Sequence, residues 1–216
     1  MMNSIKLNYI IHKDYKDLIN KNIYENIILD IMNESDVVFP GKYKHINEQS
    51  NGESDFISMD DMELLEAKTI FPRKQCESLS LGDLKEFYEI IVSETNDVFE
   101  SLMNKKDNLN STMLYKELVK AFKKIKPKEN AIIFIPFPFT LEIEESLSSL
   151  FASDIFSQII FEIKKENANF FREHNVYLIY PNLENKIILK SLTTGKVEYL
   201  KGNQISNYIY VEYLEN

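Results

Sequence analysis

Two short apolar segments separated by an acidic turn constrain most strongly how this chain can fold. Glu53–Met59 and Met62–Phe71 have the length and apolar content of β-strands, and Asp60-Asp61 between them is typical of a turn. Strands joined by so short a connection pair side by side and run antiparallel. The sequence therefore predicts a hairpin that brings the side chains of both strands into one small area.

The second of these strands carries an acid and a base on one face. Side chains alternate along a strand, so Glu66 and Lys68 project to one side while Leu65 and Ala67 project to the other. Together with Asp55 on the preceding strand, they would form a possible metal and phosphate site. Carboxylate oxygens suit Mg²⁺, and a lysine can orient water or balance charge on a phosphoryl oxygen. The alternative is a solvated pair on the sheet surface, because acid-x-Lys triplets are common by chance.

The rest of the chain alternates between helix and strand patterns. Helical periodicity predicts helices at Lys13–Met32, Leu81–Met103, Thr112–Lys126 and, for the most part, Leu141–Phe171. Strands are predicted at Val37–Tyr43, Ala131–Phe139, Val176–Tyr180, Lys186–Leu192 and Lys196–Leu200, with an edge strand at Tyr208–Tyr213. Ala131–Phe139 is apolar throughout, as expected of a strand covered on both faces. The pattern predicts an α/β protein with a central mixed β-sheet flanked by helices.

Length and composition limit the class of protein. A chain of 216 residues with 44% hydrophobic and 27% charged residues is typical of one sizeable globular domain. No apolar run reaches the ~18 residues that span a bilayer, and the first residues lack the apolar region of a signal peptide. We therefore expect a cytoplasmic protein without a membrane partner. The single Cys76 excludes an intrachain disulfide and a zinc site built from several thiolates.

The charge of the chain is negative overall and unevenly distributed. A net charge of −9 disfavours nucleic-acid binding through the whole surface. Residues Glu53–Glu66 hold six acids and no base, whereas Ser101–Asn130 holds eight lysines and three acids. The second segment fits either a local basic face or an ordinary solvated helix rich in lysine.

The order of elements and the residues Asp55 and Glu66-Ala67-Lys68 resemble the PD-(D/E)xK, or restriction-endonuclease-like, nuclease superfamily. The resemblance covers about residues 13–139. It implies a restriction-endonuclease-like core over residues 1–140, with a C-terminal helix and strand-rich extension over 141–216 packed on the same domain. The residue before Asp55 is Ser54, where the superfamily pattern has proline.

The resemblance also implies roles for individual residues. Asp55 and Glu66 would bind one or two Mg²⁺ (or Mn²⁺) ions, with the carbonyl of Ala67 completing the ligand set. Lys68 would position the nucleophile. Glu25, on the first helix, would bind through water or a second metal, and its alternative is an exposed helical carboxylate. The implied activity is that of a Mg-dependent nuclease that hydrolyses DNA phosphodiester bonds.

Two other functions remain open at this point. The chain could be a catalytically inactive nuclease-like fold that acts as a protein-binding or immunity-type module, since acidic surfaces suit basic partners. It could also be an α/β protein of another role that carries the triplet by chance. The sequence shows no module that reads a DNA sequence, so specificity would lie after Thr140 or in a protein partner.

Overall fold

A computed structural model describes residues 6–12, 21–46, 54–60, 62–70, 112–135, 159–181, 186–201 and 208–214. In chain order the elements are β1 (Lys6–His12), α1 (Lys21–Glu34), β2 (Tyr43–His45), β3 (Phe56–Ser58), β4 (Leu64–Thr69), α4 (Met113–Phe122), β5 (Asn130–Phe134), α6 (Ala168–Glu173), β6 (Val176–Pro181), β7 (Lys186–Ser191), β8 (Val197–Lys201) and β9 (Tyr208–Leu214). Residues 159–166 are also helical. The predicted α/β class, with a central mixed sheet and helices, is confirmed.

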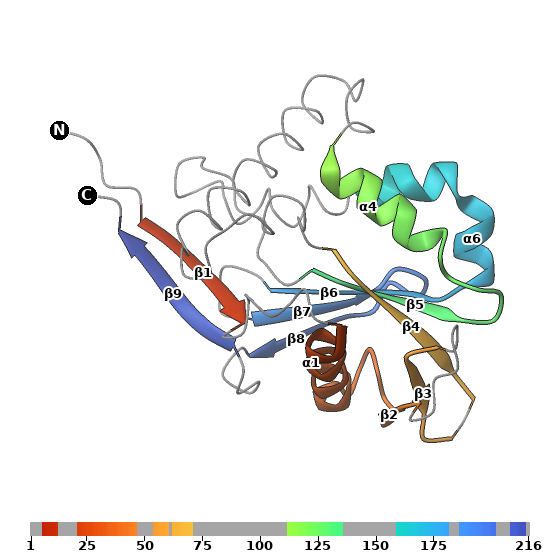
Figure 1. The fold of residues 1–216 in the computed structure, drawn as a ribbon, viewed down its shortest axis with the longest axis horizontal. Helices are drawn as coiled ribbons and strands as arrows, with labels where there is room; N and C mark the ends of the chain where they lie inside the picture. Colours follow the sequence, from red (N-terminus) through yellow and green to blue (C-terminus); the bar gives the residue numbers. More distant parts are fainter. Residues whose placement is uncertain are drawn as a thin grey trace.

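The main sheet has seven strands in the order β2-β3-β4-β5-β6-β7-β8. It opens with an antiparallel meander of β2, β3 and β4. β5 and β6 then add in parallel to β4, and β7 and β8 add as antiparallel strands. Figure 1 shows α1 on one side of this sheet and α4 and α6 on the other. Parallel neighbours need long connections that cross a sheet face, which is where α4 and α6 lie.

The centre of the sheet is its most deeply buried part. Residues 131–135, which include β5, are all buried, as the continuous apolar run predicts for a strand covered on both faces. Under the sheet, α1 contributes a buried stripe at helical spacing, made of Tyr24, Ile27, Ile28, Ile31 and Met32. Strands before and after residue 140 share this one core.

Helix α4 is amphipathic and begins at a side-chain cap. Thr112 occupies the N-cap, where its hydroxyl oxygen accepts a hydrogen bond from the N–H of Tyr115 at 3.4 Å. Leu118 and Phe122 are buried toward the sheet, while the lysines of the helix are exposed. The predicted basic helix at Thr112–Lys126 is confirmed as a helix over Met113–Phe122.

The strand predicted at Val37–Tyr43 is wrong over most of its length. Residues 36–39 form bends, and β2 is restricted to Tyr43–His45. The physical reason is that the N–H groups of Asp36, Val37 and Val38 donate to the carboxylate of Glu198. Backbone donors engaged in this way are not available to pair with a neighbouring strand.

The edge strand predicted at Tyr208–Tyr213 is a strand, but not of the main sheet. β9 pairs with β1 as a separate antiparallel two-stranded sheet, and β1 was not predicted. The turn predicted at Thr194-Gly195 is confirmed between β7 and β8, where Gly195 has a φ of +74° that a residue without Cβ adopts readily. The helix predicted at Leu81–Met103 lies outside the described residues.

Candidate active site

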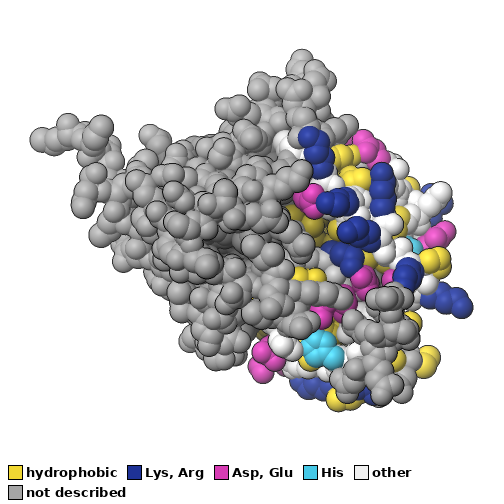
Figure 2. All heavy atoms as spheres, in the orientation of Figure 1, with side chains coloured by type: hydrophobic (Ala, Val, Ile, Leu, Met, Phe, Trp, Pro, Cys, Tyr) yellow, Lys and Arg dark blue, Asp and Glu magenta, His cyan; other side chains and the backbone are white. Residues whose placement is uncertain are grey.

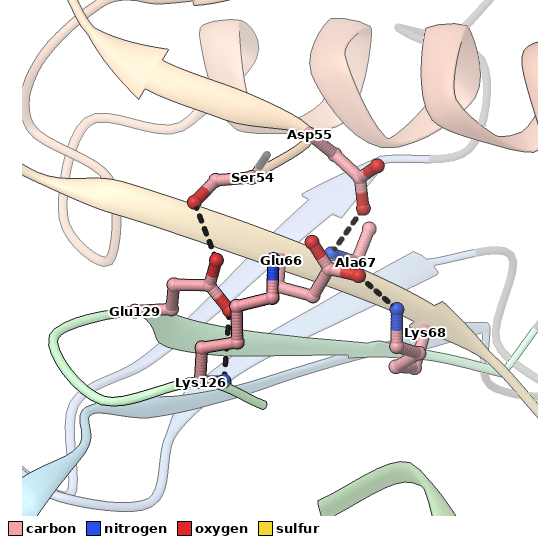
Figure 3. A network of polar contacts seen from close by, with 7 residues as sticks. All are labelled: Ser54, Asp55, Glu66, Ala67, Lys68, Lys126 and Glu129. Atoms are coloured by element: carbon pink, nitrogen blue, oxygen red, sulfur yellow. Dashed lines mark hydrogen bonds and ion pairs between the residues drawn. The ribbon is translucent and has the colours of Figure 1, made fainter. Parts of the chain in front are cut away.

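The candidate site lies where β3 and β4 separate. The two strands pair over only two positions, Phe56 with Leu65 and Ile57 with Leu64. Asp55 directly precedes β3, and its side chain binds to β4 where the main-chain pairing of the two strands stops. The N–H of Ala67 donates a 2.8 Å hydrogen bond to Oδ2 of Asp55, as Figure 3 shows. A side-chain carboxylate thus occupies the end of the strand pair, held by a main-chain donor.

The carbonyl of Ala67 faces the same edge as Asp55. In a strand, the N–H and C=O of one residue point to the same neighbouring strand. The N–H of Ala67 points to Asp55, so its carbonyl oxygen also points away from β5. The main chain of β4 therefore offers an oxygen beside the Asp55 carboxylate.

Glu66 and Lys68 share one face of β4 and form an ion pair, as the alternation of the strand predicts. Their side chains are 15% and 21% exposed, so the pair is neither fully solvated nor sealed from water. Burial raises the pKa of Glu66, and the nearby charges of Asp55 and Glu129 raise it further, while Lys68 opposes both. Asp55 and Glu129 thus both lie within electrostatic reach of Glu66, and Figure 3 shows the carboxylates of Asp55 and Glu66 side by side.

Glu129 is a member of this group that the sequence reasoning missed. It lies just before β5 and is only 5% exposed. Oε1 accepts from the hydroxyl of Ser54 at 2.9 Å, and Oε2 accepts from the N–H of Lys126 at 2.9 Å. The available signal was an acid immediately before a strand buried on both faces, but an acid at that place is common.

Ser54 gains a role from this contact. The superfamily pattern has proline at this position, and proline has no hydroxyl to donate. In this chain the Ser54 hydroxyl links the start of β3 to Glu129 at the start of β5, across the intervening strand β4. The departure from the pattern is therefore matched by a buried acceptor on the other side of the site.

Glu25 is buried rather than exposed. It lies on α1 with 5% exposure, so the exposed alternative for this carboxylate is wrong. Within the described residues, Oε1 of Glu25 and Oδ1 of Asp55 are buried oxygens that accept no hydrogen bond, although both residues have other interactions. The same residues contain no group of three or more acidic, histidine or cysteine side chains that could hold a metal ion. Glu25 therefore does not complete a cluster of three carboxylates with Asp55 and Glu66.

The oxygen atoms that do come together fit a hard divalent cation. Asp55, Glu66 and the carbonyl of Ala67 would supply two carboxylates and one neutral oxygen. Mg²⁺ commonly uses one or two protein carboxylates and keeps several waters. The donor set thus matches a loosely held Mg²⁺ or Mn²⁺ better than a closed structural metal site.

The two described histidines that are not in β1 take structural contacts. His174 is buried, with Nδ1 2.6 Å from the carbonyl oxygen of Glu129 and its ring stacked on Phe170. Nε2 of His45 lies 3.0 Å from Oδ1 of Asn26. His174 still matters for the site, because its contact helps to fix the backbone at Glu129.

We compared the chain with family models, curated proteins and solved structures. No family model, curated protein or solved structure matches the chain. Within its described parts, the chain has no helix of the length and apolar character that a membrane crossing requires.

Proposed function

We propose that this protein is a metal-dependent nuclease that hydrolyses DNA phosphodiester bonds. One observation carries the proposal: the Asp55 carboxylate is fixed on the N–H of Ala67, beside the Glu66–Lys68 pair, at the place where β3 and β4 separate. Two carboxylates and a carbonyl oxygen can hold a divalent cation, and an ammonium can balance charge on a phosphoryl oxygen, which together suit metal-assisted phosphodiester hydrolysis.

The topology supports a restriction-endonuclease-like core. α1 is followed by the meander β2-β3-β4, and β5 then returns parallel to β4. This is the arrangement that the resemblance implies for its conserved core, with the first acid at the second strand of the meander and the acid-x-Lys on the third. The fold supports the proposal only in combination with the side chains, because one fold hosts many activities.

The roles of the protein groups follow from their positions. A bound Mg²⁺ would supply Lewis acidity, lowering the pKa of a coordinated water and balancing charge on the phosphate. Asp55 is oriented beforehand by its main-chain donor, so it needs little reorganisation to act as a ligand. Glu66 would be the second ligand, and its raised pKa reflects a charge that the site leaves only partly compensated. A cation placed here would relieve that repulsion.

Lys68 has two partners in this scheme. In the described structure its ammonium pairs with Glu66. With a cation bound to Glu66, the Lys68 ammonium would be free to contact the attacking water or a phosphate oxygen on this face of β4. Lys68 would then stabilise negative charge as it develops in the transition state.

The direct test is a cleavage assay with purified protein. Linear, circular and single-stranded DNA and RNA would be incubated with Mg²⁺ or Mn²⁺, and in parallel with EDTA. We expect metal-dependent cleavage of DNA that is lost in Asp55→Asn and in Glu66→Gln. Glu173→Gln is a matched control because Glu173 is an exposed carboxylate on α6. If the wild type cuts no nucleic acid with any metal, the enzyme proposal is wrong.

A binding module without catalysis is the second candidate. One observation favours it: Lys68 already pairs with Glu66 inside the site. A melting temperature that does not change with millimolar Mg²⁺ or Mn²⁺, together with absent cleavage, would favour this candidate.

A further inference from the structure

The described surface carries a concentration of lysines next to the candidate site. On and after α4, six lysines between residues 116 and 128 are exposed, namely Lys116, Lys120, Lys123, Lys124, Lys126 and Lys128, which we call the lysine face. Figure 2 shows Lys and Arg side chains gathered where α4 lies in Figure 1, above a group of acidic side chains. This local positive charge contrasts with the net charge of −9 for the whole chain.

The spacing of these lysines makes a stripe rather than a scatter. Lys116, Lys120, Lys123 and Lys124 follow one another at intervals of four, three and one residues, which places them on one side of the helix. The opposite side is fixed by the burial of Leu118 and Phe122. From Lys116 to Lys124 the stripe is about 12 Å long at 1.5 Å per residue.

The described acids neutralise only part of this charge. Within the described residues, Lys120 pairs with Glu117 at 3.2 Å on the surface, which is a weak contact. Lys123, Lys124 and Lys126 form no ion pair with any described acid. Exposed ammonium groups such as those of Lys123, Lys124 and Lys126 suit an anionic partner.

The lysine face continues into the candidate site. The N–H of Lys126 donates to Glu129, and Glu129 lies within electrostatic reach of Glu66. Figure 3 shows Lys126 and Glu129 beside Glu66 and Lys68. The lysine face therefore reaches Glu129, which lies next to the Glu66 carboxylate of the proposed reaction.

We infer that the lysine face binds the phosphate backbone of duplex DNA and leads it to Asp55 and Glu66. This inference rests on the proposed function for the identity of its ligand. Duplex DNA carries one charge per ~1.7 Å of its axis, twice the density of one strand, so a stripe of this length faces several phosphates. The contacts involve charge only, so the binding is independent of DNA sequence.

The test measures DNA binding without cleavage. Fluorescence anisotropy in EDTA would follow a labelled duplex of roughly 20 base pairs at several salt concentrations, with single-stranded DNA and duplex RNA as comparison arms. The test variant is Lys120→Gln/Lys123→Gln/Lys124→Gln. The control is Lys42→Gln/Lys165→Gln/Lys196→Gln, which removes three exposed positive charges elsewhere.

We expect the test variant to bind duplex DNA at least ~10-fold more weakly at low salt. The slope of log affinity against log salt concentration should decrease by the equivalent of about three phosphate contacts. The control should bind nearly as the wild type does. The inference is overturned if both variants weaken equally, if the test variant is unchanged, if the wild type does not bind duplex DNA, or if it prefers RNA or single strands. Binding by the lysine face without any metal-dependent cleavage would disprove the proposed nuclease activity, while the inference that the lysine face binds duplex DNA would hold.

Discussion

The hydroxyl of Ser35, just after α1, donates a hydrogen bond to Oε2 of Glu198 on β8, 163 residues further along the chain. The same carboxylate accepts three main-chain N–H groups, from Asp36, Val37 and Val38, at 3.0 to 3.1 Å. The Glu198 side chain thus holds the segment that follows α1 against β8, the last strand of the main sheet.

We expect Glu198→Gln to destabilise the protein at neutral pH by roughly 1–2 kcal/mol, the scale of a cap with charge-assisted hydrogen bonds that is partly open to water. Burial raises the pKa of Glu198, but the hydrogen bonds from Asp36, Ser35, Val38 and Val37 outweigh it, and the net pKa is lowered. A carboxylate with a lowered pKa stabilises the fold above its ordinary pKa of 4.5, and the contribution is lost as pH falls through the lower folded value. Urea unfolding at pH 7 and in acid checks this.

The control for this prediction is Glu173→Gln, because Glu173 is an exposed carboxylate on α6. It should unfold as the wild type does at both pH values. A Glu198→Gln protein that loses the same stability in acid as at neutral pH would contradict the ionic explanation.

Divalent metal should stabilise the folded protein. Mg²⁺ or Mn²⁺ at millimolar concentration should raise the melting temperature, because a ligand that binds only the folded state stabilises it by mass action. The double variant Asp55→Asn/Glu66→Gln should show no such rise. Thermal melts with metal and with EDTA measure the difference, and an equal rise in the double variant would place the metal elsewhere.

Without metal, Glu66→Gln should be more stable than the wild type at neutral pH. Burial, with Asp55 and Glu129 nearby, raises the pKa of Glu66 above its ordinary value of 4.5. A raised carboxylate pKa means that stability falls as pH rises from that value through the higher folded one. The neutral amide removes this cost. Urea unfolding in EDTA at pH 7 would show a higher midpoint for the variant, and a lower midpoint would mean that the Lys68 pair dominates.

Lys68→Ala should lower the rate of cleavage on the order of 10²–10³-fold, the usual cost of one lost electrostatic contact to the transition state. Because the Lys68 side chain is only 21% exposed and pairs with Glu66, the variant should also lose some stability, so rates are compared below its melting temperature. Lys196→Ala, which removes an exposed lysine in the turn before β8, serves as the control. Initial rates at saturating metal measure the effect. Unchanged cleavage by Lys68→Ala would reject the role of this lysine and leave the nuclease proposal open.

Ser54→Ala should destabilise the protein by about 1–3 kcal/mol, because it leaves the buried Oε1 of Glu129 without the Ser54 hydroxyl. Ser54→Thr keeps a hydroxyl and should recover part of the loss. Thermal unfolding compares the two variants. If both lose the same stability, the hydrogen bond is not the cause.

Local pattern was sufficient for the strands that form the site. The alternation that puts Glu66 and Lys68 on one side, and the turn between β3 and β4, depend on neighbours within about ten residues, so the sequence alone predicted them. The same holds for the buried strand β5 and for the basic helix α4, whose periodicities are strong. The apolar residues of Val37–Tyr43 predict a strand, and nothing in their local pattern indicates the hydrogen bonds to the distant Glu198.

Contacts between segments far apart in the chain required the tertiary structure. Glu129 joins Asp55 and Glu66 only because β5 pairs with β4 in parallel, and no local pattern marks an acid before a strand as part of a site. The burial of Glu25 likewise depends on how α1 lies against the sheet. The sequence determined which residues alternate, cap and turn, because those choices depend on adjacent backbone geometry. The tertiary structure decided which charges meet, because that depends on strand order and on what packing removes from water.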